Sequence, residues 1–197
     1  MSETGEEQKY VKEAFDTNWV VPLGPNVNGF EEDLKAFVES STSEFKSEKL
    51  SREVVALSAG TAAVHLALLA CGVGPGDEVC VQSFTFCASS HPITYLGATP
   101  VFIDSERDTW NMDPELLEKA IIDRKEKTGK YPKAIVPVAL YGMPYDCDRI
   151  MAIANKYGIP VVEDAAEGFG SRYKGRVLGT FGKFGVLSFN GNKMITT

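Results

Sequence analysis

Lys193 and Asp164 are the two residues of this chain whose types and surroundings best suit covalent chemistry. Lys193 ends the segment Ser-Phe-Asn-Gly-Asn-Lys, and Asp164 follows the mainly apolar residues 159–163. A lysine amine can form an imine with an aldehyde, and a carboxylate that faces a ring nitrogen keeps this nitrogen protonated, so that the ring accepts electrons. A lone lysine near a chain end is usually only a solvated charge. The two groups together favour imine chemistry on an aromatic aldehyde.

The position of Asp164 supports this interpretation. The apolar run before it predicts a central strand, and open α/β sheets bind ligands at the carboxyl ends of their strands. A carboxylate buried there without a partner is unfavourable, and a protonated ring nitrogen would supply that partner. A helix-capping or purely structural aspartate is the alternative.

A second group of residues suits a phosphate. Residues 54–58 read as a buried strand, residues 59–60 as a small-residue turn, and a helix follows from Thr61. The N–H groups at such a helix start, with Gly60 and the Thr61 hydroxyl, form a pocket for a phosphate dianion. The Ser188 hydroxyl, five residues before Lys193, could bind the same phosphate. The alternative is a tight turn with an ordinary threonine cap.

Two other features allow more than one interpretation. Phe86 follows another predicted strand and could lie flat on an aromatic ring, although a phenylalanine at a strand end is usually a core residue. The glycine-rich segment Gly72–Gly76 resembles a nucleotide-binding loop. It follows a predicted helix and precedes a strand, the reverse of the dinucleotide-binding order, so we expect a turn there.

The elements that must position these residues follow an alternating pattern. Short runs rich in β-branched residues alternate with stretches of helical period, which predicts an α/β fold with a mostly parallel sheet flanked by helices. We expect strands over Val54–Ser58, Glu78–Val81, Thr99–Ile103, Ala134–Val138, Val161–Asp164 and Phe184–Phe189. We expect helices over Thr61–Cys71, Cys87–Leu96, Pro114–Lys127 (capped by Asp113) and Cys147–Tyr157, and a further helix capped by Asn28. A hairpin at Tyr173–Val177 and an exposed loop at Ser40–Ser51 complete the prediction.

Composition argues against several classes of protein. The net charge is −7 and no long basic run occurs, which disfavours a nucleic-acid surface. The four cysteines have no CxxC spacing and the chain has two histidines, so we expect no zinc site and interpret Cys71, Cys80 and Cys87 as reduced core residues. The apolar stretch Ala62–Cys71 is too short to span a bilayer, and residues 1–7 do not resemble a secretory signal. We therefore expect a protein of the reducing cytosol.

The length of 197 residues is enough for one domain or for part of a larger one. Residues 184–197 have the character of a strand and a turn and stop without a closing helix or a polar tail. We interpret the chain as the N-terminal part of a longer protein, with residues 1–30 as an N-terminal segment and residues 31–197 as an incomplete large domain.

Five motifs, taken in order, resemble the DegT family of nucleotide-sugar aminotransferases. They are Ala-Gly-Thr-Ala (59–62), Ser-Phe-Thr-Phe (83–86), Glu-Asp-Ala-Ala-Glu (163–167), the stretch 173–182 and Ser-Phe-Asn-Gly-Asn-Lys (188–193). The resemblance implies the aspartate-aminotransferase fold (fold type I), a homodimer with active sites at the subunit interface, and pyridoxal 5'-phosphate as the cofactor. The remaining strands of the family's large domain and its small C-terminal domain would lie outside this chain.

The same resemblance implies a role for each matched residue. Lys193 would carry the cofactor, Asp164 would pair with its pyridine nitrogen, and Phe86 would stack on its ring. Gly60, Thr61 and Ser188 would hold the phosphate, and Glu167 falls where the family places a Gln, Glu or His close to the cofactor. Family members that dehydrate their substrates replace the lysine with histidine, whereas this chain keeps the lysine.

Within the family, the motifs are most similar to enzymes that aminate UDP-4-keto-6-deoxy-N-acetylglucosamine on the route to bacillosamine-type sugars. This implies a transaminase with a nucleotide-linked 4-keto-6-deoxy sugar as acceptor and an amino acid, glutamate by expectation, as donor. A non-catalytic sensor that keeps the fold and the cofactor is the rival hypothesis. An NAD-dependent oxidoreductase based on Gly72–Gly76 does not fit the context of that motif.

Overall fold

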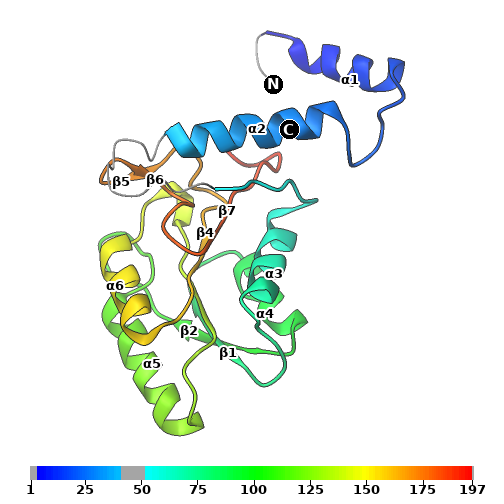
Figure 1. Cartoon of the computed structure of the whole chain (residues 1–197). Coiled ribbons are helices and arrows are strands. Elements are labelled where there is room, and N and C mark those ends of the chain that lie inside the picture. Colours follow the sequence, from blue (N-terminus) through cyan, green and yellow to red (C-terminus); the bar gives the residue numbers. More distant parts are fainter. Residues whose placement is uncertain (1–3, 41–51, 197) are drawn as a thin grey trace. The chain divides into compact units, whose positions relative to one another are not determined.

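The computed structural model of the chain describes residues 4–40 and 52–196. They belong to two compact units, Met1–Ala56 and Leu57–Thr197. Figure 1 shows the elements of both units. All residues with a predicted role in chemistry belong to the second unit, so its sheet and helices are the elements that position the candidate site.

The described part of the first unit contains two helices, α1 (Glu6–Asp16) and α2 (Pro25–Ser40). The sequence did not suggest α1. Helix α2 begins at Pro25, which suits a first helical position because it has no N–H to leave unpaired. The predicted cap, Asn28, therefore lies inside the helix, and that prediction was wrong. From residue 41 onward, the loop predicted at Ser40–Ser51 lies outside the described residues.

The second unit is built on parallel strands. Strands β2 (Thr99–Ile103), β1 (Glu78–Gln82) and β3 (Ala134–Val136) pair in that order, and β4 (Val162–Asp164) pairs with β7 (Phe184–Val186). Isolated parallel bridges, Ile135 to Val161 and Val138 to Asp164, join the two groups. The strand order is thus β2-β1-β3-β4-β7. Because all five run in one direction, their carboxyl ends lie at the same edge, where parallel sheets bind ligands.

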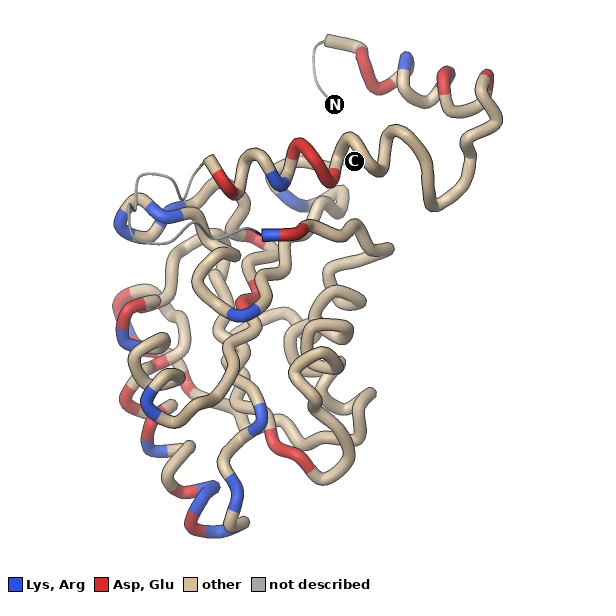
Figure 2. The backbone as a smooth tube through the Cα atoms, in the orientation of Figure 1, with Lys and Arg blue, Asp and Glu red and all other residues tan. Residues whose placement is uncertain are grey.

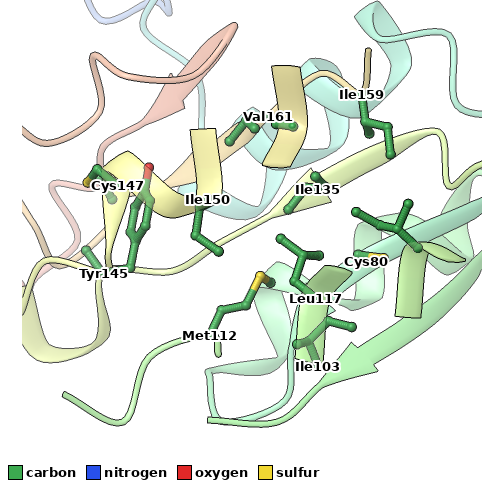
Figure 3. Packing of buried hydrophobic residues seen from close by; sticks show 14 of the residues in the cluster. Cys80, Ile103, Met112, Leu117, Ile135, Tyr145, Cys147, Ile150, Ile159 and Val161 are labelled. Carbon is green, nitrogen blue, oxygen red and sulfur yellow. The ribbon is translucent and has the colours of Figure 1, made fainter. Parts of the chain in front are cut away.

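Two pairs of helices cover opposite faces of this sheet (Figure 1). Helices α3 (Gly60–Ala70) and α4 (His91–Tyr95) pack with Val79 and Val81 of β1. Helices α5 (Pro114–Thr128) and α6 (Cys147–Tyr157) pack with Cys80 on the other face. Figure 3 shows Cys80 in one buried cluster with Leu117 of α5 and Ile150 of α6. The alternation along β1 is that of a strand buried on both faces. The predicted α/β class is confirmed.

The helices on the two faces differ in charge. Basic and acidic residues alternate along α5 and α6, whereas α3 and α4 carry neither (Figure 2). Ion pairs such as Lys156–Glu118 and Arg149–Glu115 join α6 to α5 at the surface. Helices α3 and α4 instead expose apolar side chains, Leu66, Leu69 and Tyr95. No helix among the described residues has the length and apolar character needed to cross a membrane.

All of the predicted strands except one are confirmed. Strand β2 has the predicted bounds, while β3 stops before Pro137, which has no N–H to donate to a neighbouring strand. No strand forms over Val54–Ser58, so that prediction was wrong. The Ala56 N–H donates instead to the Glu31 side chain (2.7 Å), and Val55 is largely exposed, so this segment lacks the burial expected of a central strand.

The predicted helix Cys87–Leu96 is the other correction. It is divided into a short 3₁₀ turn, η1 (Cys87–Ser89), and α4. Pro92 explains the division, because it has no N–H to donate to the preceding turn and suits the first turn of a new helix. Cys87 is exposed and is not the core residue that we expected, whereas Cys80 is fully buried. Burial raises the pKa of the Cys80 thiol to about 12.

The remaining local predictions are confirmed. Asp113 caps α5 by accepting hydrogen bonds from the N–H groups of Glu115 and Leu116. The hairpin forms from β5 (Arg172–Tyr173) and β6 (Arg176–Val177), and the residues between them, Lys174 and Gly175, have the positive φ angles of a tight two-residue turn. Gly72 and Gly76 also have positive φ angles, as the turn at this segment requires.

We predict that Gly185→Ala strongly destabilises the protein. A Cβ at this position of β7 would lie 1.9 Å from the Gly179 carbonyl oxygen, a backbone atom that cannot rotate away. We expect a loss of about 3 kcal/mol in the free energy of unfolding, measured by urea titration. Gly74→Ala is the control, because a Cβ there meets nothing within 4 Å. Equal stability of the two variants would contradict the packing described for β7.

Candidate functional site

Asp164 lies at the carboxyl end of β4, as predicted, and its side chain is buried, with a residue exposure of 5%. Its Oδ2 accepts a hydrogen bond of 2.6 Å from the Ser89 hydroxyl, and its Oδ1 accepts one of 3.2 Å from the Ala166 N–H. A carboxylate has about four acceptor positions, so these two bonds leave room for a further donor. No helix follows Asp164, so it is not a helix cap, and its spare acceptor position can serve a ligand.

Burial raises the pKa of the Asp164 carboxyl because it disfavours the charged form. The Ser89 hydroxyl, the Ala166 N–H and the positive charge of Lys193 act in the opposite direction, and the negative charge of Glu167 adds to the effect of burial. The charged form of Asp164 thus depends on groups from three other parts of the chain. The charge of Lys193 is one of these influences, and the roles predicted for Lys193 and Asp164 stay predictions.

The Lys193 amine points to Glu167. The distance from Lys193 Nζ to Glu167 Oε1 is 3.3 Å, and both side chains are mostly buried. The other oxygen of Glu167, Oε2, accepts a hydrogen bond of 2.7 Å from the Tyr141 N–H. Glu167 therefore holds the amine on one side and a backbone loop on the other. It lies beside Lys193, where a group bound to that lysine would be.

Gly60 and Ser188 lie side by side, although they are 128 positions apart in the sequence. A Cβ added to Gly60 would lie 3.4 Å from the Ser188 Cβ and 3.6 Å from its Oγ. Gly60, Thr61 and Ala62 open α3, whose first backbone bond runs from the Ala63 N–H to the Ala59 carbonyl. Their N–H groups have no acceptor within the helix and suit an anion. Ala59 is the N-cap, so the alternative of a threonine cap was wrong.

Phe86 precedes η1 and is 74% exposed, so it is not a core residue. Its loop is fixed near Asp164 by Ser89, three residues later, whose N–H donates to the Phe86 carbonyl (3.1 Å). An exposed aromatic ring in a loop attached to the buried carboxylate is compatible with the predicted stacking role. That role stays a prediction.

Several residues of the site could not be found from local sequence patterns. Ser89 contacts Asp164 across 75 positions, and its only sequence signal is a serine in a loop after a strand. Thr85 lies 2.9 Å from Ser89, Oγ1 to Oγ. Tyr141 has a left-handed backbone with a φ angle of 50°, an uncommon conformation outside glycine that no motif predicted.

Glu163, the neighbour of Asp164, points to the other face of β4 and bonds to the turn before β7. It is fully buried, and its Oε1 accepts hydrogen bonds from the N–H groups of Phe181 (2.9 Å) and Gly182 (3.3 Å). Burial raises the pKa of its carboxyl, and these N–H groups act against that rise. Glu163 thereby fixes the turn before β7, the strand that leads to Ser188 and Lys193.

The arrangement fits a cofactor that has an aldehyde, a ring nitrogen and a phosphate. The Gly60–Ser188 cradle lacks the side chain that would fill it, Lys193 supplies an amine, and Asp164 has acceptor capacity to spare. The described residues contain no group of three or more His, Cys, Asp or Glu side chains placed to bind a metal ion. The Lys193 amine beside these acids can support imine chemistry.

Comparison with known families agrees with this geometry. The DegT/DnrJ/EryC1/StrS aminotransferase family matches residues 1–197, the whole chain. The chain belongs to this family. Among the curated members, EpsN of Bacillus subtilis (strain 168) is 50% identical over 194 residues, which are 98% of this chain and 47% of EpsN. GDP-perosamine synthase of Escherichia coli O157:H7 is 41% identical over 98% of this chain and 48% of the synthase. The chain thus spans about half the length of these family members.

Solved structures of similar proteins support the fold. The aminotransferase from Psychrobacter cryohalolentis matches with a TM-score of 0.84 and 35% identity, over 99% of this chain and 45% of that one. NtdA from Bacillus subtilis, solved with the bound cofactor PMP, matches with a TM-score of 0.72 and 32% identity, over 94% of this chain and 39% of that one. The expected fold of the family's aminotransferases is therefore confirmed for this chain.

We predict that Glu163→Gln changes how stability depends on pH. Because the folded-state pKa of Glu163 is raised above its unfolded value of about 4.3, its contribution to stability is full at low pH and is lost as the pH rises through the folded-state pKa. Glutamine has the shape of the protonated acid and cannot ionise. The unfolding free energy of the variant minus that of the wild type should therefore increase from about pH 4.3 upward.

Urea titrations at a series of pH values measure this difference. Glu126→Gln, at an exposed position of α5, controls for the loss of one negative charge. A difference between Glu163→Gln and wild type that stays constant with pH would show that Glu163 is not stabilised in its neutral form.

Proposed function

We propose that this chain is the cofactor-holding part of an aminotransferase that uses pyridoxal 5'-phosphate and acts on nucleotide-linked sugars. The observation that carries the proposal is that the Lys193 amine contacts Glu167 at 3.3 Å and that its positive charge acts on the buried Asp164 carboxyl. The NtdA structure, which matches this chain, contains PMP, the amine form of the same cofactor. When bound, pyridoxal phosphate supplies an electron-accepting ring that takes an amino group from a donor and gives it to an acceptor.

Each residue has a defined task in this proposal. Lys193 binds the aldehyde carbon and, once released, moves a proton between substrate and cofactor. Asp164 accepts the N–H of the ring and keeps that nitrogen protonated. Glu167 holds the Lys193 amine in position from a distance of 3.3 Å. Phe86 stacks on the ring.

The phosphate is held at the start of α3 in this proposal. Gly60 leaves space beside Ser188 for the anion, which the N–H groups at the helix start and the hydroxyls of Thr61 and Ser188 bind. The negative charge of a phosphate also interacts favourably with the positive end of the helix dipole.

We infer that the acceptor is a 4-keto-6-deoxy sugar linked to a nucleotide, and that glutamate is the donor. A relative that is 41% identical is a GDP-perosamine synthase, and another that is 44% identical over 78% of this chain is a UDP-2-acetamido-2-deoxy-3-oxo-D-glucuronate aminotransferase. Both names support a nucleotide-linked sugar. The motifs themselves favour a UDP-linked acceptor of the bacillosamine type.

We also propose a cytoplasmic homodimer. The uncharged face of α3 and α4, with exposed Leu66, Leu69 and Tyr95, is the kind of surface that a second copy covers. All four cysteines are free, which suits a reducing compartment. Within the chain, we assign residues 31–197 to the cofactor-binding domain and residues 1–30 to an N-terminal segment.

We predict that Lys193→Ala abolishes amino transfer. Turnover of the complete protein should fall by about 10³-fold or more, because the substitution removes both the covalent anchor and the proton-transferring base. The assay measures amino-sugar product from 4-keto UDP- or TDP-sugars with glutamate. Lys183→Ala, at an exposed lysine ten residues earlier, is the matched control and should retain activity. Near-normal turnover by Lys193→Ala would refute the assignment of Lys193.

A second experiment separates the enzyme from a non-catalytic sensor on the same fold. The complete protein with bound pyridoxal phosphate should be yellow, and glutamate should remove the colour, because the amino group of the donor passes to the cofactor. The measurement is the visible absorbance before and after addition of glutamate. Colour that persists with every amino acid tested would favour the sensor, since both intact Lys193 and Asp164 would then serve binding alone.

A further inference from the structure

The hydroxyl groups of Thr85 and Ser89 and the Asp164 carboxylate form a continuous chain of hydrogen bonds. The distance is 2.9 Å from Thr85 Oγ1 to Ser89 Oγ and 2.6 Å from Ser89 Oγ to Asp164 Oδ2. Ser89 has an exposure of 1%, so water does not replace its bonds. Thr85 and Ser89 belong to the loop and 3₁₀ turn that follow β1, whereas Asp164 ends β4. These hydrogen bonds therefore join the segment after β1 to the end of β4, at the edge of the sheet where parallel sheets bind ligands.

The chemistry of the three groups fixes the direction of these bonds. An ionised carboxylate can only accept, so the single proton of Ser89 is directed to Asp164. The Ser89 oxygen must then accept from Thr85, which donates. If Asp164 were neutral, its own proton could point to Ser89 and both bonds could reverse. The donor-to-acceptor direction of these hydrogen bonds is thus coupled to the charge of Asp164.

We propose that Ser89, oriented by Thr85, is a positioning residue that keeps Asp164 ionised and in place to accept the ring N–H of pyridoxal phosphate. This inference rests on the proposed function. Burial favours the neutral carboxyl, and a buried aspartic acid in its neutral form could not hold the ring nitrogen protonated by charge. Ser89 acts against burial before the cofactor arrives, as does Lys193, whereas Glu167 adds to the effect of burial.

The test is the affinity of the complete, cofactor-free protein for pyridoxal phosphate, measured by absorbance titration. Ser89→Ala should raise the Kd about 10- to 100-fold, because it removes a bond to a charged group. Thr85→Val keeps a similar shape and removes the hydroxyl that donates to Ser89, and it should raise the Kd by a smaller factor, about 3- to 10-fold. Ser90→Ala is the control, because the Ser90 hydroxyl bonds to the Cys87 carbonyl and not to Asp164.

The dependence on pH gives a signature that a merely structural role would not produce. Removing a bond to the charged form raises the pKa of Asp164, so the ratio of the Kd of Ser89→Ala to that of the wild type should increase as the pH falls. Lys193 and Glu167, the other charges that act on Asp164, are unchanged in both proteins. A ratio that does not change with pH would contradict the proposal.

Double variants test whether the three groups act as one chain. Thr85→Val should have no further effect once Ser89 is Ala, and Ser89→Ala should have none once Asp164 is Asn. If Ser89→Ala does not fold, Thr85→Val decides the matter alone: it should weaken binding in the wild type and not in Asp164→Asn. If Thr85→Val weakened pyridoxal phosphate binding equally in the wild type and in Asp164→Asn, the proposed hydrogen-bond chain would be refuted.

The outcomes also separate this inference from the proposed function. If Asp164→Asn leaves both the Kd and the absorbance of bound pyridoxal phosphate unchanged, then Asp164 does not hold the ring and the proposed function loses its central residue. If Asp164→Asn weakens binding while Ser89→Ala stays within about 2-fold of the wild type, the proposed function stands and Ser89 has no positioning role.

Discussion

The candidate site is organised around one buried carboxyl group, that of Asp164. An unpaired buried charge is among the least favourable features a fold can contain. Asp164 is stabilised by donors from two directions, Ser89 and the Ala166 N–H, and by the charge of Lys193. Because these groups come from the segment after β1, the turn after β4 and the segment after β7, the three must meet in space. The need to supply hydrogen-bond donors to the buried Asp164 carboxyl therefore brings these segments together.

A second buried polar group fixes the loops at the same edge of the sheet. Gln82, at the end of β1, is fully buried; its amide nitrogen donates to the Phe84 carbonyl (2.9 Å), and its oxygen accepts from the Met112 N–H (2.8 Å). Asn111 extends this network by donating to the Met143 carbonyl (2.9 Å). A fully bonded polar network is rigid, because every displaced member leaves an unpaired group. The loops that carry Phe86 and Tyr141 are thus attached to a fixed base.

The sequence predicted the elements whose signals are local and missed those that tertiary contacts decide. Helix α6 has the predicted bounds, and its start is fixed locally, because the Asp146 side chain accepts from the Arg149 N–H. The segment Val54–Ser58 has the same β-branched character as the true strands, yet it forms no strand, because a strand requires a partner as well as propensity. Pro92 was a readable signal that the helix predicted at Cys87–Leu96 would break.

The site shows the same division between local and tertiary information. The position of Asp164 at a strand end could be predicted from the apolar run before it, and Lys193 was proposed from a motif, whereas Ser89 and Tyr141 are defined only by contact. Tyr141 illustrates why such contacts matter: its left-handed backbone costs of order 1 kcal/mol. In this conformation its N–H reaches Glu167, whose other oxygen holds the Lys193 amine. The unfavourable backbone conformation of Tyr141 is thus offset by a contact that orients Glu167 beside Lys193. A local sequence pattern cannot predict this compensation, because the contacting residues are far apart in the sequence.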